Sequence, residues 1–219
     1  MSGSSYTQLL DLAAGLVLVC AILTLWRSDL RAITSILSIQ GVALGVVAGV
    51  LAIHIHDGAL AITAVIVFVV KGSVIPILIR QVVRRDPGSR EVSPLINVPA
   101  SLAGAVVLVA IAFLASGKIT ALFPNPASRL APIGIATVLV GFLVLVTRRK
   151  TVSQIVGLLL IDNGVALVAF LLTTGVPLVV ELGASLDVLL VVVVLRVLAT
   201  VMRTHFGAFD LDQMQELRD

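Results

Sequence analysis

Seven long apolar segments, joined by short polar connections, constrain this chain more than any other feature of its sequence. An apolar stretch of about 20 residues can cross the hydrocarbon core of a bilayer as one helix, in which the backbone hydrogen bonds are made internally. We therefore expect an all-α integral membrane protein with about seven transmembrane helices. The expected spans cover residues 9–26, 33–53, 59–82, 98–116, 131–146, 151–173 and 182–202.

The composition supports a membrane protein and argues against other classes. Of the 219 residues, 59% are hydrophobic and 12% are charged, whereas about a quarter of the residues in a soluble domain are charged. The net charge of +3 does not indicate nucleic-acid binding, because the basic residues are spread over short connections and base stacking would depend on one Trp and one Tyr. The first apolar segment follows a polar start without basic residues, so we expect a retained helix rather than a signal peptide.

Residue types that carry metal or enzyme chemistry are scarce in the sequence. The single cysteine, Cys20, lies in an apolar run, and with three His it makes no complete four-ligand metal site and no iron–sulfur motif. The chain also lacks a Gly-rich phosphate loop, a nucleophile motif and a CxxC pair. We therefore expect no catalytic centre and no cofactor in this chain, and we expect any redox chemistry to belong to another subunit.

The distribution of basic residues predicts the orientation in the membrane, because cytoplasmic connections are enriched in Lys and Arg. Eleven basic residues lie after the first, third and fifth expected spans or in the tail, against two in the amino terminus and the other connections. The amino terminus is therefore expected outside, the carboxyl terminus in the cytoplasm, and the protein in the cell membrane. The eleven are Arg27, Arg31, Arg80, Arg84, Arg85, Arg90, Arg148, Arg149, Lys150, Arg203 and Arg218, and the two are Lys118 and Arg129.

An internal repeat is suggested by two pairs of segments. "IQGVALGVVAG" in the second expected span matches "IDNGVALVAFL" in the sixth, and "VFVVKGSVIPILIRQ" in the third resembles "VVVVLRVLATVMRTH" in the seventh. Units that begin at the first and fifth spans have the same orientation, so the repeat would be parallel. The expected domains are a three-helix repeat at 1–92, a linking helix at 93–128, a second three-helix repeat at 129–205 and a cytoplasmic tail at 206–219.

Several polar residues lie inside the expected spans, where they are costly. An Asp or Lys at a helix centre costs about 2.5–3.5 kcal/mol on insertion scales, so it usually faces protein or water and often marks an ion pathway. The candidate pathway residues are Gln40, Lys71, Asp162, Asn163, Asp187 and Arg196, with Glu181 near the outer end of the last span.

Two of these residues have both a functional and a structural interpretation. Asp162 lies midway along its span, where it could relay protons or make a packing hydrogen bond with Asn163. Lys71 could hold and release a proton, or serve as a fixed counter-ion for a carboxylate of this chain or of a neighbour. Gly72 and Pro76 follow Lys71 and are expected to loosen the helix there, which could admit water.

The remaining candidates lie nearer the membrane surfaces. Asp187 and Arg196 are nine residues apart, on opposite helix faces, so they cannot pair with each other. Arg196 could extend its guanidinium toward the cytoplasm. His54, His56 and Asp57 are expected in a loop at the outer surface. They could form a metal site or take part in proton access.

Four motifs resemble the hydrogenase-4 component E family, a membrane subunit of formate hydrogenlyase and related group 4 hydrogenase complexes. They are "IQGVAL", "KGSVIP", "QIVGLLLIDNG" and "MRTHFGAFDLDQMQEL", which together extend over nearly the whole chain. The carboxyl-terminal three expected helices are also similar to the NuoK-type subunit of complex I and the MrpC-type subunit of cation/proton antiporters. The resemblance implies neighbouring antiporter-like and quinone-site-like membrane subunits, and a cytoplasmic redox arm with iron–sulfur and nickel subunits.

The resemblance also implies roles for individual residues. Asp162 matches the acidic residue of an "ENG"-like motif, with Glu shortened to Asp, and Asp187 matches the acid that opens the last helix. Lys71 and Gln40 match polar positions of the amino-terminal half. Where the NuoK-type subunits carry a second buried glutamate, this chain has Lys71 or Arg196, which argues against a complete proton channel within this subunit alone.

We therefore expect a non-catalytic membrane subunit of a hydrogenase-like or complex-I-like assembly that contributes polar residues to a proton or cation axis. Two alternatives remain at the level of the sequence. The chain could belong to a multi-subunit sodium/proton antiporter without a redox partner, or it could be a structural scaffold that orders larger subunits and lipid.

Overall fold

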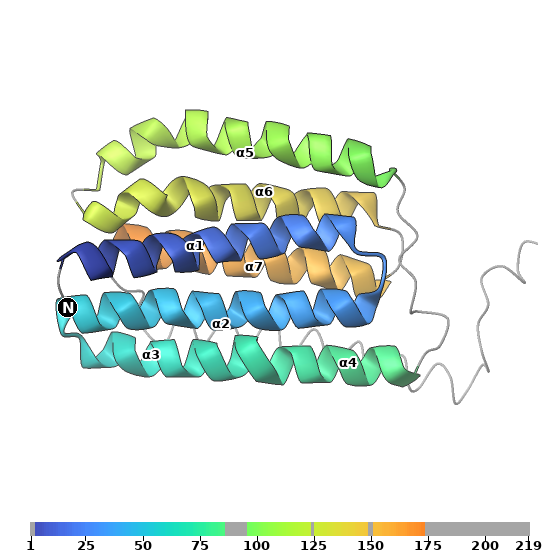
Figure 1. Cartoon of the computed structure of the whole chain (residues 1–219), viewed down its shortest axis with the longest axis horizontal. Coiled ribbons are helices and arrows are strands. Elements are labelled where there is room, and N and C mark those ends of the chain that lie inside the picture. The colour runs from blue at the N-terminus through green and yellow to red at the C-terminus, as the bar shows by residue number, and fades with distance from the viewer. Residues whose placement is uncertain (1–2, 86–95, 124, 149–150, 174–219) are drawn as a thin grey trace, which may run out of the picture.

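The computed structural model describes residues 3–85, 96–123, 125–148 and 151–173, and its regular structure in these ranges is helical. The α-helices of the described residues are labelled α1 to α7 in Figure 1. A π-helical turn, η1 (Val70–Val74), joins α3 to α4, and a 3₁₀ turn, η3 (Pro126–Leu130), leads into α6. The α-helices are α1 (Gly3–Trp26), α2 (Leu30–Ile55), α3 (Gly58–Val69), α4 (Ile75–Arg85), α5 (Val98–Ala121), α6 (Ala131–Thr147) and α7 (Thr151–Thr173).

Six helical segments of the described residues are long and apolar enough to cross a membrane, which confirms an all-helical, multi-pass architecture. They coincide with the first six expected spans. The seventh expected span, 182–202, lies outside the described residues together with Glu181, Asp187 and Arg196, so the count of seven stays a prediction. The six segments are Ser4–Trp26, Leu30–Ile55, Gly58–Gln81, Val98–Lys118, Pro126–Thr147 and Ser153–Thr173.

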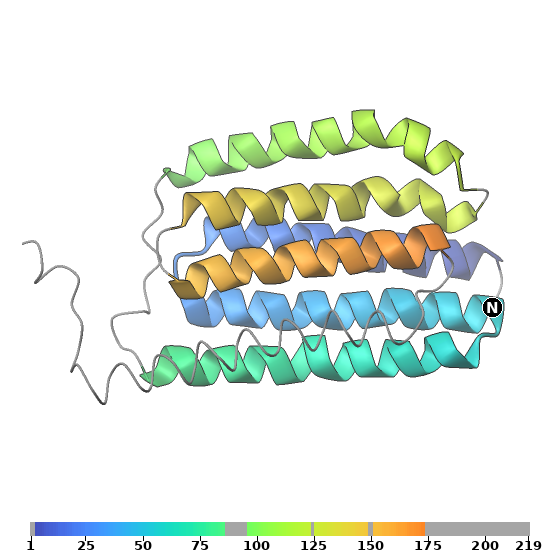
Figure 2. The ribbon, with the colours of Figure 1, turned by 180° about the vertical axis from the view of Figure 1, so that it is seen from behind.

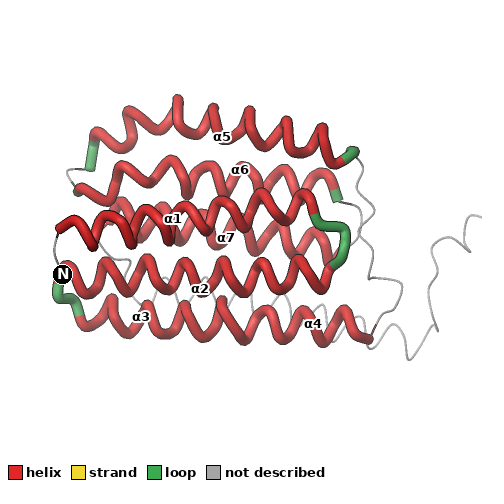
Figure 3. Tube along the Cα trace, in the orientation of Figure 1, coloured by secondary structure: helices red, strands yellow, loops and turns green. Residues whose placement is uncertain are grey.

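The six segments lie side by side as one bundle (Figures 1 and 3). In the centre, α1 packs against α2 and α6, and α7 packs against the same two helices from the opposite side (Figures 1 and 2). The helix formed by α3, η1 and α4 covers α2 at one edge, and α5 covers α6 at the other. Following the predicted orientation, we call the end where α1 begins the outer end, and the opposite end the inner end.

Local sequence signals explain where helices begin and end. Asp29 precedes α2 and its carboxylate accepts a hydrogen bond from the backbone N–H of Arg31. Asp57 precedes α3 and accepts from the first backbone N–H groups of that helix. Both are N-cap residues, which offer an oxygen to donors that have no partner within the helix. His56 ends α2 in the left-handed conformation, with a φ of 57°.

Helices α6 and α7 approach each other closely through glycines. Gly134 and Gly141 on α6, and Gly157 and Gly164 on α7, each contact the partner helix. A Cβ placed on Gly164 would lie 2.7 Å from the backbone nitrogen of Val138, so a side chain there would push the helices apart. Small residues at such intervals let membrane helices pack backbone against backbone.

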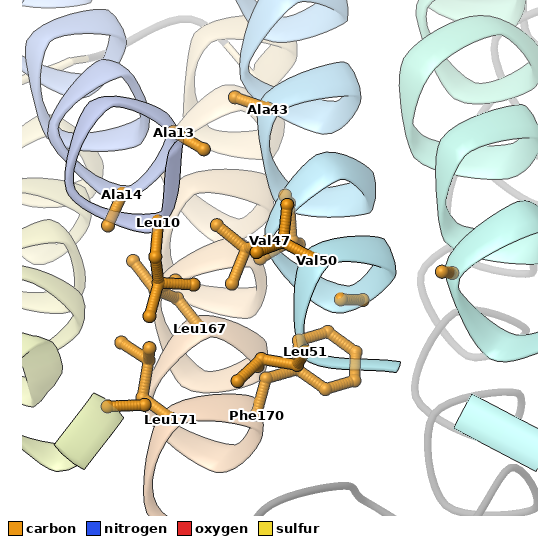
Figure 4. Close-up of a cluster of buried hydrophobic side chains, with 14 of the residues drawn as sticks. Leu10, Ala13, Ala14, Ala43, Val47, Val50, Leu51, Leu167, Phe170 and Leu171 are labelled. Carbon is orange, nitrogen blue, oxygen red and sulfur yellow. The ribbon is translucent and has the colours of Figure 1, made fainter. Parts of the chain in front are cut away.

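The apolar core falls into two clusters, one toward each end of the bundle. The outer cluster includes Leu10, Val47, Leu51, Leu167 and Phe170, which meet between α1, α2 and α7 (Figure 4). The inner cluster is built from α1, α2 and α4 to α7. In α1, α2 and α7 the outer cluster uses residues 6–17, 43–52 and 166–171, and the inner cluster uses residues 21–25, 30–37 and 155–160.

Candidate functional site

A polar layer separates the two apolar clusters, and four of the seven predicted pathway residues lie in it. Gln40 comes from α2, Lys71 from η1, and Asp162 and Asn163 from α7. The gaps between the clusters, at residues 38–42 of α2 and 161–165 of α7, coincide with this layer. The site therefore lies near the middle of the membrane-spanning segments.

The two charged residues of the layer pair with each other. Lys71 Nζ lies 2.9 Å from Asp162 Oδ2, and the side chains of Lys71 and Asp162 are 3% and 13% exposed. The sequence left open whether the counter-ion of Lys71 belongs to this chain or to a neighbour, and the structure places it on this chain. Opposite charges in direct contact reduce the cost of keeping both inside the membrane.

The two amides of the layer connect three helices. Asn163 Nδ2 donates a hydrogen bond of 2.9 Å to Gln40 Oε1, and Gln40 Nε2 donates one of 3.0 Å to the Val17 carbonyl of α1. The sequence also suggested a packing hydrogen bond between Asp162 and Asn163. The structure instead directs them to different partners, because adjacent residues of a helix do not face each other.

The helix that carries Lys71 is not regular α-helix at this point. From Val70 to Val74 it forms a π turn, which ends with a bond from the Ile75 N–H to the Val70 carbonyl. Pro76 has no N–H to donate to the Gly72 carbonyl, and the hydroxyl of Ser38 on α2 donates to that carbonyl instead. The predicted loosening after Lys71 therefore takes the form of a π turn that a neighbouring serine stabilises.

The backbone of Lys71 lies directly against α2 because α2 has a glycine there. A Cβ on Gly41 would lie 2.4 Å from both the carbonyl carbon and the carbonyl oxygen of Lys71. Gly45, one helical turn further, contacts Phe68 of α3 in the same way. Ser38, Gly41 and Gly45 were not predicted as site residues, although the G-x-x-x-G spacing of the glycines is a sequence signal of close helix contact.

At the inner end, one of the basic residues used for the topology prediction is buried. Arg148 is 4% exposed, and its guanidinium donates to the carbonyls of Thr24 and Leu25 at the end of α1. Burial lowers the pKa of the Arg148 guanidinium from its usual value. Arg148 thus satisfies terminal carbonyls of α1 in addition to contributing positive charge to this end.

At the outer end, His54 lies in the last turn of α2 rather than in the predicted loop, and both His54 and Asp57 have structural contacts. The ring of His54 stacks on that of Tyr6 with centroids 3.8 Å apart, and Asp57 caps α3. Within the described residues, no group of three or more His, Cys, Asp or Glu side chains is placed to hold a metal ion. An exposed ion pair that the sequence analysis missed joins Asp11 to Arg129 at 2.7 Å.

Comparisons with known proteins found one relative over the full length of the chain and others over part of it. The chain is 41% identical over 220 residues to the uncharacterized protein Rv0085 of Mycobacterium tuberculosis, and the match covers all of both chains. It is 37% identical over 81 residues to hydrogenase-4 component E of Escherichia coli K12, a match that covers 36% of this chain and 37% of the other. Hydrogenase-4 component E of Shigella flexneri matches to the same extent. No protein-family model and no solved structure matches the chain.

Proposed function

The chain belongs to the family of the Mycobacterium tuberculosis protein Rv0085, and from this premise and the partial similarity to hydrogenase-4 component E we propose that it is a membrane subunit of a hydrogenase-like complex. In this proposal the chain contributes its polar layer to a proton or cation pathway. It carries no catalytic centre of its own. The redox reaction that supplies the energy takes place in other subunits.

The observation that carries the proposal is the buried contact between Lys71 and Asp162. A membrane protein that needed only stable packing would gain little from this pair, because apolar side chains fill the same space without the desolvation cost. The two ionisable groups lie 2.9 Å apart, so the charge of each acts directly on the other. A proton that arrives at Asp162 removes the charge that stabilises the Lys71 ammonium, so uptake at one group favours release from the other.

The amides have a supporting role in the proposal. Gln40 and Asn163 do not titrate, but their hydrogen bonds hold α1, α2 and α7 together beside the ion pair. They also supply a polar environment in which a charge is less costly than in hydrocarbon. Asp187, Glu181 and Arg196 are proposed to extend the axis toward a neighbouring subunit.

The proposed neighbours are antiporter-like and quinone-site-like membrane subunits and a cytoplasmic redox arm with iron–sulfur and nickel subunits. The protein would lie in the cell membrane with its amino terminus outside and its carboxyl terminus in the cytoplasm, as the distribution of basic residues favours. Purification of the native complex followed by iron and nickel analysis distinguishes this proposal from the antiporter alternative. Both metals are expected in stoichiometric amounts, and a complex without them would favour the antiporter.

The pathway role is tested by proton and sodium uptake into vesicles that carry the native complex. Asp162→Asn keeps the shape of the side chain and removes its ability to exchange a proton, so uptake should fall by at least about tenfold. The matched control is Asp11→Asn, which removes the exposed carboxylate paired with Arg129 and should leave uptake unchanged. Normal uptake by a fully assembled Asp162→Asn complex would contradict the proposal and favour a structural scaffold.

A further inference from the structure

A series of polar groups runs from the inner end of the bundle to the backbone next to Lys71, along the flank where α2 faces α4 and η1. Arg80 of α4 donates to the hydroxyl of Ser35 at 3.1 Å, and Ser35 donates to the Arg31 carbonyl. Ser38, one turn further along α2, donates to the Gly72 carbonyl. Gly72 directly follows Lys71. The series begins at exposed side chains and ends at the backbone carbonyl of the residue that follows the buried Lys71.

The backbone at the end of this series is easily hydrated. The Gly72 carbonyl lacks the helical N–H that Pro76 cannot provide, so its hydrogen bond depends on a side chain that can exchange it for water. The wide π turn leaves the local backbone bonds less regular than in an α-helix. Ser73, within the same turn, is exposed on the surface of the bundle.

The opposite half of the described bundle is apolar around the site. The outer cluster, which includes Leu10, Val47, Leu51, Leu167 and Phe170, fills the space between α1, α2 and α7 (Figure 4). Its members on α2 and α7 lie closer to the outer end than Gln40 and Asn163 do. The buried hydroxyls of Thr63 and Thr137 in this half each bond to a carbonyl of their own helix. In the inner half of the described bundle, the inner cluster fills the centre, and the buried hydroxyls of Thr24 and Thr34 bond to carbonyls of their own helices, whereas the serines of α2 connect to a neighbouring helix.

We propose that water and protons reach the Lys71–Asp162 pair from the inner end along Ser35 and Ser38, and that the pair is closed to the outer end. This inference rests on the proposed function, since it names the side of the membrane from which the site exchanges protons. With the predicted orientation, that side is the cytoplasm. A proton taken up there leaves the pair toward a neighbouring subunit rather than through the outer half of this chain.

Cysteine labelling tests the route, because a thiol reacts with a charged reagent only where water can solvate the thiolate. Cys20, the single cysteine of this chain and a buried residue, is first replaced by serine. One cysteine is then introduced per variant, as Ser35→Cys, Ser38→Cys or the control Val47→Cys in the outer cluster. A membrane-impermeant methanethiosulfonate is added to either side of vesicles that carry the native complex, and labelling of this subunit is measured by mass.

Ser35→Cys and Ser38→Cys should react from the inner side, and Ser38→Cys should react at least about tenfold faster than Val47→Cys, which lies in a dry cluster. Val47→Cys should stay unlabelled from the outer side. The route is overturned if Ser38→Cys is as unreactive as Val47→Cys, or if Val47→Cys reacts from outside. If Ser38→Cys fails to assemble, Ser73→Cys in the π turn takes its place. Labelling of Ser73→Cys from the inner side supports the route, and an unlabelled Ser73→Cys overturns it.

The labelling and ion-uptake experiments test the two proposals separately. Labelling reports only which side hydrates the flank, so its result is valid whatever Asp162→Asn does to uptake. Normal ion uptake by the Asp162→Asn complex would contradict the proposed function. If Asp162→Asn loses uptake but Ser38→Cys is not labelled, only the route along the serines is contradicted.

Discussion

At the residue scale, the candidate site depends on two charges that are acceptable only together. Lys71 and Asp162 are each costly inside a bilayer, and their cost is what identified them in the sequence. Their pairing could not be predicted in the same way. It depends on Gly41, which lets α2 lie against the Lys71 backbone, and on the π turn that contains Lys71. The contact at Gly41 joins helices far apart in the sequence, and the sequence predicted a loosened helix after Lys71 but not its form as a π turn.

The pair makes a prediction about stability. Lys71→Met leaves the Asp162 carboxylate buried without its counter-ion and should destabilise the protein by about 3–5 kcal/mol. Lys71→Met combined with Asp162→Asn removes both charges and should recover most of this loss. The measurement is the thermal stability of the detergent-solubilised complex for the wild type, both single variants and the double variant.

Additive losses in the double variant would show that the two side chains do not interact, and would contradict the pairing seen at 2.9 Å. A suitable control is the exposed pair of Asp11 and Arg129. Arg129→Met, Asp11→Asn and the double variant should each change the free energy of unfolding by less than about 1 kcal/mol.

At the element scale, the helices and the place of one irregularity were predictable, whereas the form of that irregularity was not. The expected spans at 151–173 and 98–116 match α7 and the first part of α5, because a long apolar run in a bilayer has to be helical. The amino-terminal polar stretch was expected as a tail, whereas α1 begins at Gly3. Hydrophobicity shows where an apolar run begins, but a helix can extend beyond that run into polar residues.

The contact between α2 and η1 makes a prediction of its own. Gly41→Ala would bring a Cβ to 2.4 Å from the Lys71 carbonyl group, so the two helices must separate. We expect lower thermal stability and reduced ion uptake. Gly15→Ala is the matched control, since no heavy atom lies within 4 Å of the added methyl group. Equal behaviour of the two variants would show that α2 and η1 are not in close contact in the working protein.

At the scale of the whole molecule, the bundle places α2 and α7 side by side. These helices correspond to the second and sixth expected spans, whose sequences suggested a parallel repeat, and Gln40 and Asn163 from the matched segments bond to each other. The repeat remains a prediction, because its third pair includes the span at 182–202, which lies outside the described residues. The sequence predicts which segments span the membrane. It does not predict which spans pack against each other, because their apolar surfaces have similar compositions.

The orientation of the bundle makes a prediction at this scale. Alkaline phosphatase fused after His56 should be active, because the connection between α2 and α3 is expected outside, and a fusion after Arg27 should be inactive. Expression of the two fusions is compared by immunoblot. The reverse pattern of activity would place the basic connections outside and would move the proposed proton route to the other side of the membrane.

The most direct test of the central claim is proton and sodium uptake by vesicles that carry the Lys71→Met/Asp162→Asn double variant. This variant removes the chemistry of the pair while avoiding an unpaired buried charge, so the loss of stability that complicates the single variants is reduced. We predict an assembled complex whose ion uptake falls by at least about tenfold. An assembled double variant with wild-type uptake would show that Lys71 and Asp162 only stabilise the bundle.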